Sequence, residues 1–165
     1  MKATVVFVIK DSKILLARKM KKIGAGKLNG YGGKPEPEDI SIRHTACREL
    51  FEESGKGILV TPDNLSGEST VDFYFYDNKT TEPNWSVVFY LAHTFTGTAT
   101  STEEMSDPHW FNLNKIPYDE MLPADRIILE KLLSGKHFNG SVRFNEEKTD
   151  LLESRFTEED SVTNH

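Results

Sequence analysis

The sequence contains little of what several classes of protein depend on. Only one of its 165 residues is a cysteine, Cys47, so no disulfide can form within the chain, and the composition fits a reducing compartment. No apolar run approaches the ~18 residues of a membrane-spanning helix, and the N-terminus carries no signal-peptide pattern. We therefore expect a soluble, cytoplasmic protein with no membrane partner.

Basic residues are also fewer than acidic ones. Lysine and arginine total 20 against 26 aspartates and glutamates, which gives a net charge of −6. Because such a chain has no broad basic surface, we expect no affinity for a nucleic-acid polymer. Any handling of anionic phosphates must therefore rely on a metal ion or on a local cluster of lysines and arginines.

Internal repeats and domain linkers are absent from the sequence as well. A chain of 165 residues is long enough to bury one core. We place a single domain at residues 1–156, followed by a polar tail at 157–165 that we expect to be frayed. We expect the domain to be a monomer that acts on a small molecule.

Runs of β-branched and aromatic residues predict the strands of a mixed α/β protein. The chain opens with two such runs joined by a turn at 11–13. The expected strands are 4–9, 14–18, 71–76, 85–92, 109–111, 142–144 and 150–156. Five glycines within 24–33 are too many for a regular element, so this segment is expected to be a shaped loop.

Helical patterns occur at two places. The first helix is expected to begin at a cap, Asp39 or Ser41, and to end at Gly55 or Gly57. The second is expected over 125–133, where apolar residues at helical spacing cover one face of the sheet.

Three glutamates on the first predicted helix carry the strongest functional signal. Glu49, Glu52 and Glu53 stand at positions i, i+3 and i+4, so one helix face holds all three carboxylates. Like charges at this spacing repel, so the arrangement opposes the helix unless a cation compensates it. Mg²⁺ takes carboxylate oxygens together with phosphates. The pattern therefore indicates metal-assisted phosphate chemistry.

A solvated helix face is the competing interpretation of this charge run. Helix geometry argues against it, because Ile42, Ala46 and Leu50 form an apolar stripe. Glu49 and Glu53 fall within ~40° of Ile42 on the helical wheel. The acids then border the buried face, where an unpaired carboxylate is costly. Arg48 offers one partner and a metal ion a better one.

The segment around these glutamates resembles the signature of the Nudix hydrolase family. A glycine-rich loop ending at Gly33 is followed by Arg48-Glu49-Leu50-x-Glu52-Glu53-x-Gly55, which has the spacing of that signature. The upstream glutamate of the signature is missing, because its position, counted back from Arg48, holds Ile40. Gly33 also lies one residue farther from Arg48 than the signature expects. An extra residue near 35–39 explains both departures, with Glu38 or Asp39 in the glutamate's place.

The resemblance implies an α/β/α sandwich around a mixed sheet and a hydrolase that depends on Mg²⁺ or Mn²⁺. It implies that the metal ligands are Gly33 through its carbonyl, Glu49, Glu52, Glu53 and Glu104. Glu104 could instead be an ordinary exposed loop residue.

The resemblance also implies how the reaction proceeds. The metal polarises the phosphoryl oxygens and lowers the pKa of a water, and a glutamate accepts the proton of that water. Glu49 is the preferred base, although Glu53 and Glu104 remain candidates because sequence does not separate a base from a ligand. Arg48 is expected to orient the glutamates rather than to touch substrate.

Matches outside the signature extend the resemblance to the animal-type 8-oxo-dGTP diphosphatases of the same family. They occur in order over roughly residues 3–156. They comprise the loop Gly24–Lys34, Glu104-Met105, Trp110-Phe111-x-Leu113-x-x-Ile116-Pro117, Met121-x-Pro123-x-Asp125 and Phe138-x-Gly140.

In that family an asparagine and an acidic pair hydrogen-bond the base, and a tryptophan stacks on it. Asn29 matches the asparagine and Asp125 the second acid, whereas Ala124 and Leu122 stand at the positions of the first acid and the tryptophan. Asn29 could instead stabilise its own loop, and Asp125 could cap the helix that it begins.

Further substrate contacts are expected from basic and aromatic residues. Lys19, with Lys21 and Lys22, precedes the glycine loop and could meet the triphosphate, or could be a solvated charge run. Phe73, with Phe75 and Trp85, could form an aromatic wall, although alternating aromatics on a strand are more often core.

The sequence thus predicts hydrolysis of a nucleoside triphosphate to the monophosphate and pyrophosphate, with oxidised purines preferred. Two alternatives stay open. One is a Nudix enzyme for a dinucleotide, a nucleotide sugar or a methylated purine nucleotide. The other is a catalytically weak module that binds a nucleotide.

Overall fold

The computed structural model describes residues 1–159, and residues 160–165 lie outside the described part. The strands of its main sheet are β1 (Lys2–Lys10), β2 (Lys13–Lys19), β3 (Leu28–Asn29), β5 (Leu65–Tyr74), β6 (Trp85–Ala92), β8 (Met105–Asn112), β9 (His137–Phe144) and β10 (Leu151–Glu159). The helices are α1 (Ile42–Glu53) and α2 (Asp125–Leu133). The short strands β4 (Ile58–Leu59) and β7 (Thr96–Gly97) pair with each other, and single 3₁₀ turns cover Pro62–Asn64, Leu113–Lys115 and Tyr118–Glu120.

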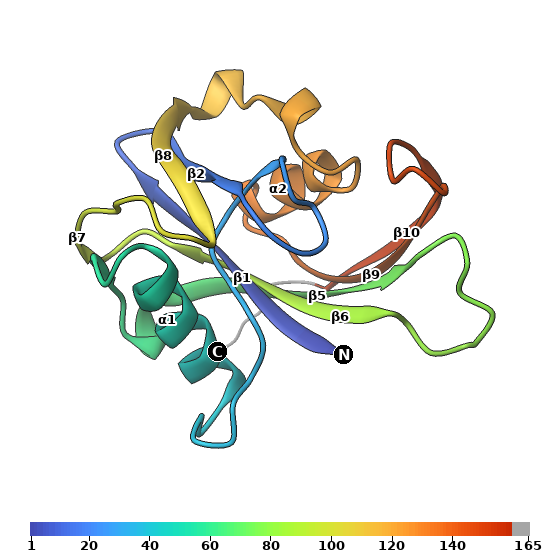
Figure 1. Ribbon diagram of the computed structural model, residues 1–165, viewed down its shortest axis with the longest axis horizontal. Coiled ribbons are helices and arrows are strands. Elements are labelled where there is room, and N and C mark those ends of the chain that lie inside the picture. Colours follow the sequence, from blue (N-terminus) through green and yellow to red (C-terminus); the bar gives the residue numbers. More distant parts are fainter. Residues whose placement is uncertain (160–165) are drawn as a thin grey trace.

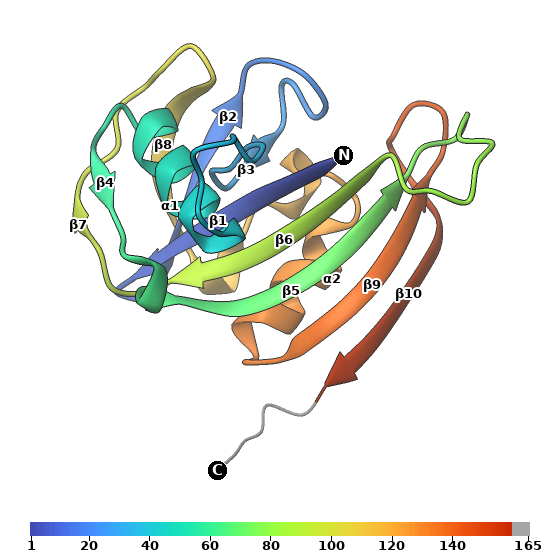
Figure 2. The same ribbon diagram turned by 90° about the horizontal axis from the view of Figure 1, so that it is seen from below.

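Within residues 1–159 the main sheet is mixed and has eight strands, in the order β10-β9-β5-β6-β1-β2-β3, with β8 also paired to β2. β1 runs parallel to β6, and β5 runs parallel to β9, while the other neighbours are antiparallel. Figure 2 shows β6, β5, β9 and β10 running side by side, with β10 at the outer edge. The mixed sheet expected from the sequence is confirmed.

The two helices cover opposite faces of this sheet (Figure 1). Alternate residues of β1 point to different faces, so Phe7 joins the core beneath α2, and Val6 joins the core beneath α1. Ile128 from α2 and Leu50 from α1 are fully buried in these two cores. The expected α/β/α sandwich is therefore also confirmed.

The predicted helix boundaries agree with the structure. Ser41, and not Asp39, is the N-cap of α1, and its side chain accepts a hydrogen bond from the His44 N–H at 3.1 Å. The helix ends before Gly55, whose φ of 78° suits a residue without a side chain. α2 occupies the same residues, Asp125–Leu133, that its apolar spacing predicts.

Several strands extend beyond their predicted limits, among them β9, which begins at His137 and not at 142. β5 begins at Leu65, contains a bulge between Ser66 and Ser69, and ends at Tyr74. β8 begins at Met105. β10 continues through residues 157–159, which pair with β9, so the prediction of a frayed tail beginning at 157 is wrong for these residues. The rest of that predicted tail lies outside the described residues.

No helix within residues 1–159 is long and apolar enough to cross a membrane.

Candidate functional site

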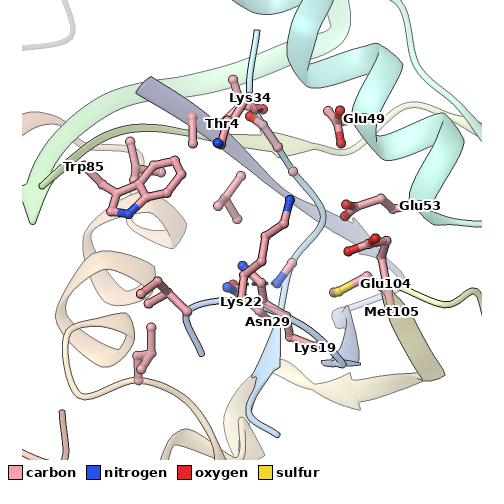
Figure 3. A pocket seen from close by; sticks show the side chains of 18 of the residues that line it. Thr4, Lys19, Lys22, Asn29, Lys34, Glu49, Glu53, Trp85, Glu104 and Met105 are labelled. Carbon is pink, nitrogen blue, oxygen red and sulfur yellow. Dashed lines mark hydrogen bonds between the residues drawn. The ribbon is translucent and has the colours of Figure 1, made fainter. Parts of the chain in front are cut away.

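A cavity of about 770 Å³ opens between the first residues of β1, the glycine loop and α1 (Figure 3). It gathers residues that are far apart in the sequence. Of the site residues predicted from the sequence, Arg48 and Lys21 do not line it. The predicted residues that line it are Lys19, Lys22, Asn29, Gly33, Glu49, Glu52, Glu53, Phe73, Phe75, Trp85, Glu104 and Asp125. The cavity therefore brings the expected metal ligands and the expected base-binding residues into one site.

Glu49, Glu53 and Glu104 form an acidic wall of the cavity. Arg48 lies behind this wall and forms hydrogen bonds that hold Glu49 in place. Its Nε and Nη2 donate to the two carboxylate oxygens of Asp39 at 2.9 and 3.0 Å. Its Nη1 donates to Glu49 at 2.8 Å and to Glu52 at 3.1 Å. Such a bidentate pair fixes the guanidinium plane. This geometry supports the predicted role of Arg48 in orienting the glutamates.

Asp39 takes the place of the missing upstream glutamate. Its side chain is only 3% exposed, and it also accepts hydrogen bonds from Thr45 Oγ1 at 2.7 Å and from the Glu36 N–H at 2.9 Å. The Arg48 guanidinium holds the pKa of this carboxyl well below its usual range. Of the two substitutes left open by the sequence, the structure selects Asp39 and leaves Glu38 exposed.

Gly33 makes room for the carboxylate of Glu49. A Cβ atom at this position would overlap that carboxylate, so the loop needs a residue without a side chain here. The Gly33 carbonyl accepts a hydrogen bond from the Thr4 N–H at 2.9 Å, which ties the loop to β1. The Thr4 hydroxyl also donates to this oxygen at 3.4 Å. The part of the Gly33 carbonyl in metal binding therefore stays a prediction.

Glu53 and Glu104 face one another in the cavity, and Glu49 lies on the same wall (Figure 3). Burial, together with the neighbouring carboxylates of Glu49 and Glu104, raises the pKa of Glu53 to about 7, although a hydrogen bond from the Gly32 N–H acts in the opposite direction. Burial likewise raises the pKa of Glu49 in spite of its pairing with Arg48. These carboxylates are therefore held close together at an energetic cost.

This donor set fits a hard divalent cation. Carboxylate oxygens are the ligands that Mg²⁺ prefers. A cation would stabilise the ionised forms of Glu49 and Glu53, which burial and neighbouring carboxylates disfavour. Within residues 1–159, however, no three histidine, cysteine or acidic side chains are already arranged around one metal position. Glu52 in particular is 50% exposed and is paired with Arg48. The structure thus brings the predicted ligands to one wall of the cavity without arranging them as a complete coordination shell.

Lys19 lies close both to Glu53 and Glu104 and to Asp125. Burial lowers the pKa of its ammonium group, while the charges of Glu53, Glu104 and Asp125 act in the opposite direction. Lys21, by contrast, pairs with Glu104 at 3.7 Å and does not line the cavity. Lys22 also lines the cavity but is exposed, so Lys19 is the most buried lysine of the predicted cluster.

Asn29 and Asp125 lie in the cavity as predicted, and each also makes a local contact. The Asn29 side-chain oxygen accepts a hydrogen bond from the Gly30 N–H at 2.8 Å, which leaves its amide N–H groups for a ligand. Asp125 is 3% exposed and accepts a hydrogen bond from the Leu122 N–H at 3.2 Å. Burial raises the pKa of Asp125 to about 7. The N-cap of α2 is Ala124, so the alternative that Asp125 serves as the cap is wrong.

Phe73 contributes to the wall of the cavity mainly as a core residue. It is 7% exposed, and its ring stacks on Phe89 and Phe144 with centroid distances of 6.3 and 5.7 Å. Sequence reasoning missed Lys34, which lines the cavity with its ammonium group over the Trp85 ring at 5.4 Å. Its position directly after Gly33 was the signal that could have pointed to it.

Comparison with known proteins identifies the family of this chain. A model of the NUDIX domain family matches residues 1–132. Relatives described as oxidized purine nucleoside triphosphate hydrolase occur in Mus musculus and Danio rerio. The mouse protein is 35% identical over 148 residues, which cover 90% of this chain and 89% of that protein. The zebrafish protein is 35% identical over 141 residues, which cover 86% and 85%.

A solved structure shows the same fold. The crystal structure of a MutT protein from Bacillus halodurans aligns with a TM-score of 0.75 over 94% of this chain and 96% of its own, at 24% identity. Taken with the sequence matches, this shows that the chain belongs to the Nudix hydrolase family. Nudix hydrolases act on small nucleotide substrates and generally use a divalent metal ion.

Proposed function

We propose that this protein is a Mg²⁺-dependent nucleoside triphosphate diphosphatase that prefers oxidised purines and releases the monophosphate and pyrophosphate. One observation carries the proposal. The acidic wall formed by Glu49, Glu53 and Glu104 and the polar groups of Asn29 and Asp125 line the same cavity. The names of the mouse and zebrafish relatives support the substrate class.

Residues of the acidic wall would bind the metal and accept a proton. Mg²⁺, when bound, polarises the phosphoryl oxygens and lowers the pKa of a water molecule. Glu49 was the preferred base from the sequence, but its hydrogen bond from Arg48 makes it a poorer proton acceptor. Glu53 has no arginine or lysine partner within 4.0 Å among the described residues and faces the cavity. We therefore assign the proton to Glu53 and ligation to both glutamates.

Base recognition would rely on hydrogen bonds in a confined space. Asn29 offers amide donors, and Asp125 accepts or donates according to its protonation, because its pKa lies at about 7. An analogue without the matching base edge would leave the buried Asp125 carboxyl without a hydrogen-bond partner. This lowers the binding free energy of the analogue, so the site would reject it. Lys19 lies between these residues and the glutamates, where the phosphates of a bound nucleotide would begin.

A panel of substrates tests the proposal. Purified protein is assayed with Mg²⁺ on 8-oxo-dGTP, dGTP, a dinucleoside polyphosphate, ADP-ribose and a methylated purine nucleotide, and the products are separated. We expect 8-oxo-dGMP and pyrophosphate, with kcat/KM clearly above that for dGTP. Release of orthophosphate as the direct product, or faster turnover of ADP-ribose, would overturn the proposal.

A further inference from the structure

Aromatic rings form the part of the cavity wall contributed by β5, β6 and β9. Phe73, Phe89 and Phe144 are buried and stacked against each other, so their ring faces are already covered by protein. Trp85 and Phe75 are only half-buried. Of the aromatic residues that line the cavity, these two are the ones with a face left for a ligand.

The backbone on both sides of Trp85 is firmly held. The Asn84 N–H donates to the Phe73 carbonyl at 2.9 Å, and the Ser86 N–H donates to the Met1 carbonyl at 2.7 Å. Trp85 itself pairs with Phe73 at the start of β6. Its indole is therefore presented from a rigid strand, which reduces the entropy lost when a ligand stacks on it.

A lysine covers the Trp85 ring in the structure. The Lys34 ammonium lies 5.4 Å from the ring centroid, and it forms no salt bridge among residues 1–159. A cation over an exposed aromatic face is held weakly and can be replaced by another π system. Lys34 also follows Gly33 directly, so the covered ring lies beside the loop that leads to the acidic wall. Figure 3 shows Trp85 on the other side of the cavity from the glutamates.

We propose that Trp85 is the surface on which the base of the nucleotide stacks, and that the arriving base displaces Lys34 from the ring. This inference rests on the proposed function. The base is the part of a nucleotide that has a π face, so it can stack on an aromatic ring. Aliphatic lining residues such as Leu122 and Val87 offer no ring for such stacking. Phe75 is the smaller of the two open rings and is tilted against Phe144 at 6.4 Å, with Lys148 over it.

Tryptophan fluorescence tests the stacking directly, because the chain has two tryptophans. The other, Trp110, lies on β8 and does not line the cavity, so Trp110→Phe isolates the emission of Trp85. This variant is titrated without metal with 8-oxo-dGMP, GMP, AMP and UMP, and with pyrophosphate as a probe that has no base. We expect saturable quenching by the purine monophosphates and none by pyrophosphate. Absence of quenching by every nucleotide overturns the inference.

Kinetics of Trp85 variants provide a second test. Trp85→Leu should raise KM for the best triphosphate about tenfold and leave kcat within about threefold, because base–aromatic stacking contributes to binding. Trp85→Phe should recover most of the loss, and Trp110→Leu is the matched control. Thermal unfolding is measured for each variant. If Trp85→Leu does not fold, Trp85→Phe and the fluorescence titration decide; an unchanged KM in a folded Trp85→Leu overturns the inference.

Variants of Lys34 test the displacement. Lys34→Met removes the charge and keeps an apolar side chain, so guanosine, which carries no phosphate, should bind about two- to fivefold more tightly. Lys34→Arg keeps a cation for the ring and should bind guanosine as the wild type does. Equal or weaker guanosine binding by Lys34→Met overturns the displacement. Failure of the proposed function is distinguishable, since it would appear as wild-type protein that releases no pyrophosphate although bases still quench Trp85.

Discussion

The buried carboxyl of Asp125 should make the stability of the protein depend on pH. Its pKa is raised from 3.8 to about 7 because burial disfavours the ionised form. Between these values the folded protein holds a proton that the unfolded chain has released. The stability conferred by the neutral form is therefore complete below pH 3.8, falls as the pH rises, and is fully lost above about 7.

Asp125→Asn removes this titration and keeps the shape of the side chain. The amide oxygen can still accept the hydrogen bond of the Leu122 N–H. For each pH unit between 5 and about 7, the free energy of unfolding of the wild type falls by ~1.4 kcal/mol relative to that of the variant. The difference in the free energy of unfolding between the two proteins should therefore change by roughly 2–3 kcal/mol from pH 5 to pH 8, in favour of Asp125→Asn at pH 8.

Urea unfolding of both proteins at pH 5 and at pH 8 measures this change. Contributions from other titrating groups, such as Glu53, occur in both proteins and cancel. Asp119→Asn, which changes an exposed carboxyl close to α2, is the matched control and should show no such change. A difference between Asp125→Asn and wild type that is the same at both pH values would refute the reasoning, because Asp125 would then be ionised normally.

Three further predictions concern the acidic wall. Glu53→Gln should lower kcat at saturating Mg²⁺ by at least about 100-fold while the fold survives; activity within threefold of wild type would contradict the assignment. Asp39→Ala should cost about 2 kcal/mol of stability in thermal unfolding, since Arg48 loses its bidentate partner but keeps other carboxylates; Glu38→Ala is the control, and equal effects of both would contradict the role of Asp39. EDTA should abolish pyrophosphate release, and Mg²⁺ or Mn²⁺ should restore it; turnover in EDTA would exclude the proposed chemistry.

Local patterns determined the helices and the placement of the three glutamates of α1 on one helix face. The spacing of Glu49, Glu52 and Glu53 places them on one face of any α-helix, whatever surrounds it. The apolar spacing after Asp125 likewise predicted α2 at its observed residues. A helix forms hydrogen bonds within one segment, so its limits and faces can be deduced from that segment alone.

Tertiary structure decided which separate segments meet. The sequence left Glu38 and Asp39 as equal substitutes, and the packing of the loop against Arg48 selected Asp39. The sequence also grouped Phe73 with Trp85, although stacking buries the first ring and leaves the second open to the cavity. Such choices depend on pairings between distant strands, including the parallel pairs β1–β6 and β5–β9, which no local pattern encodes.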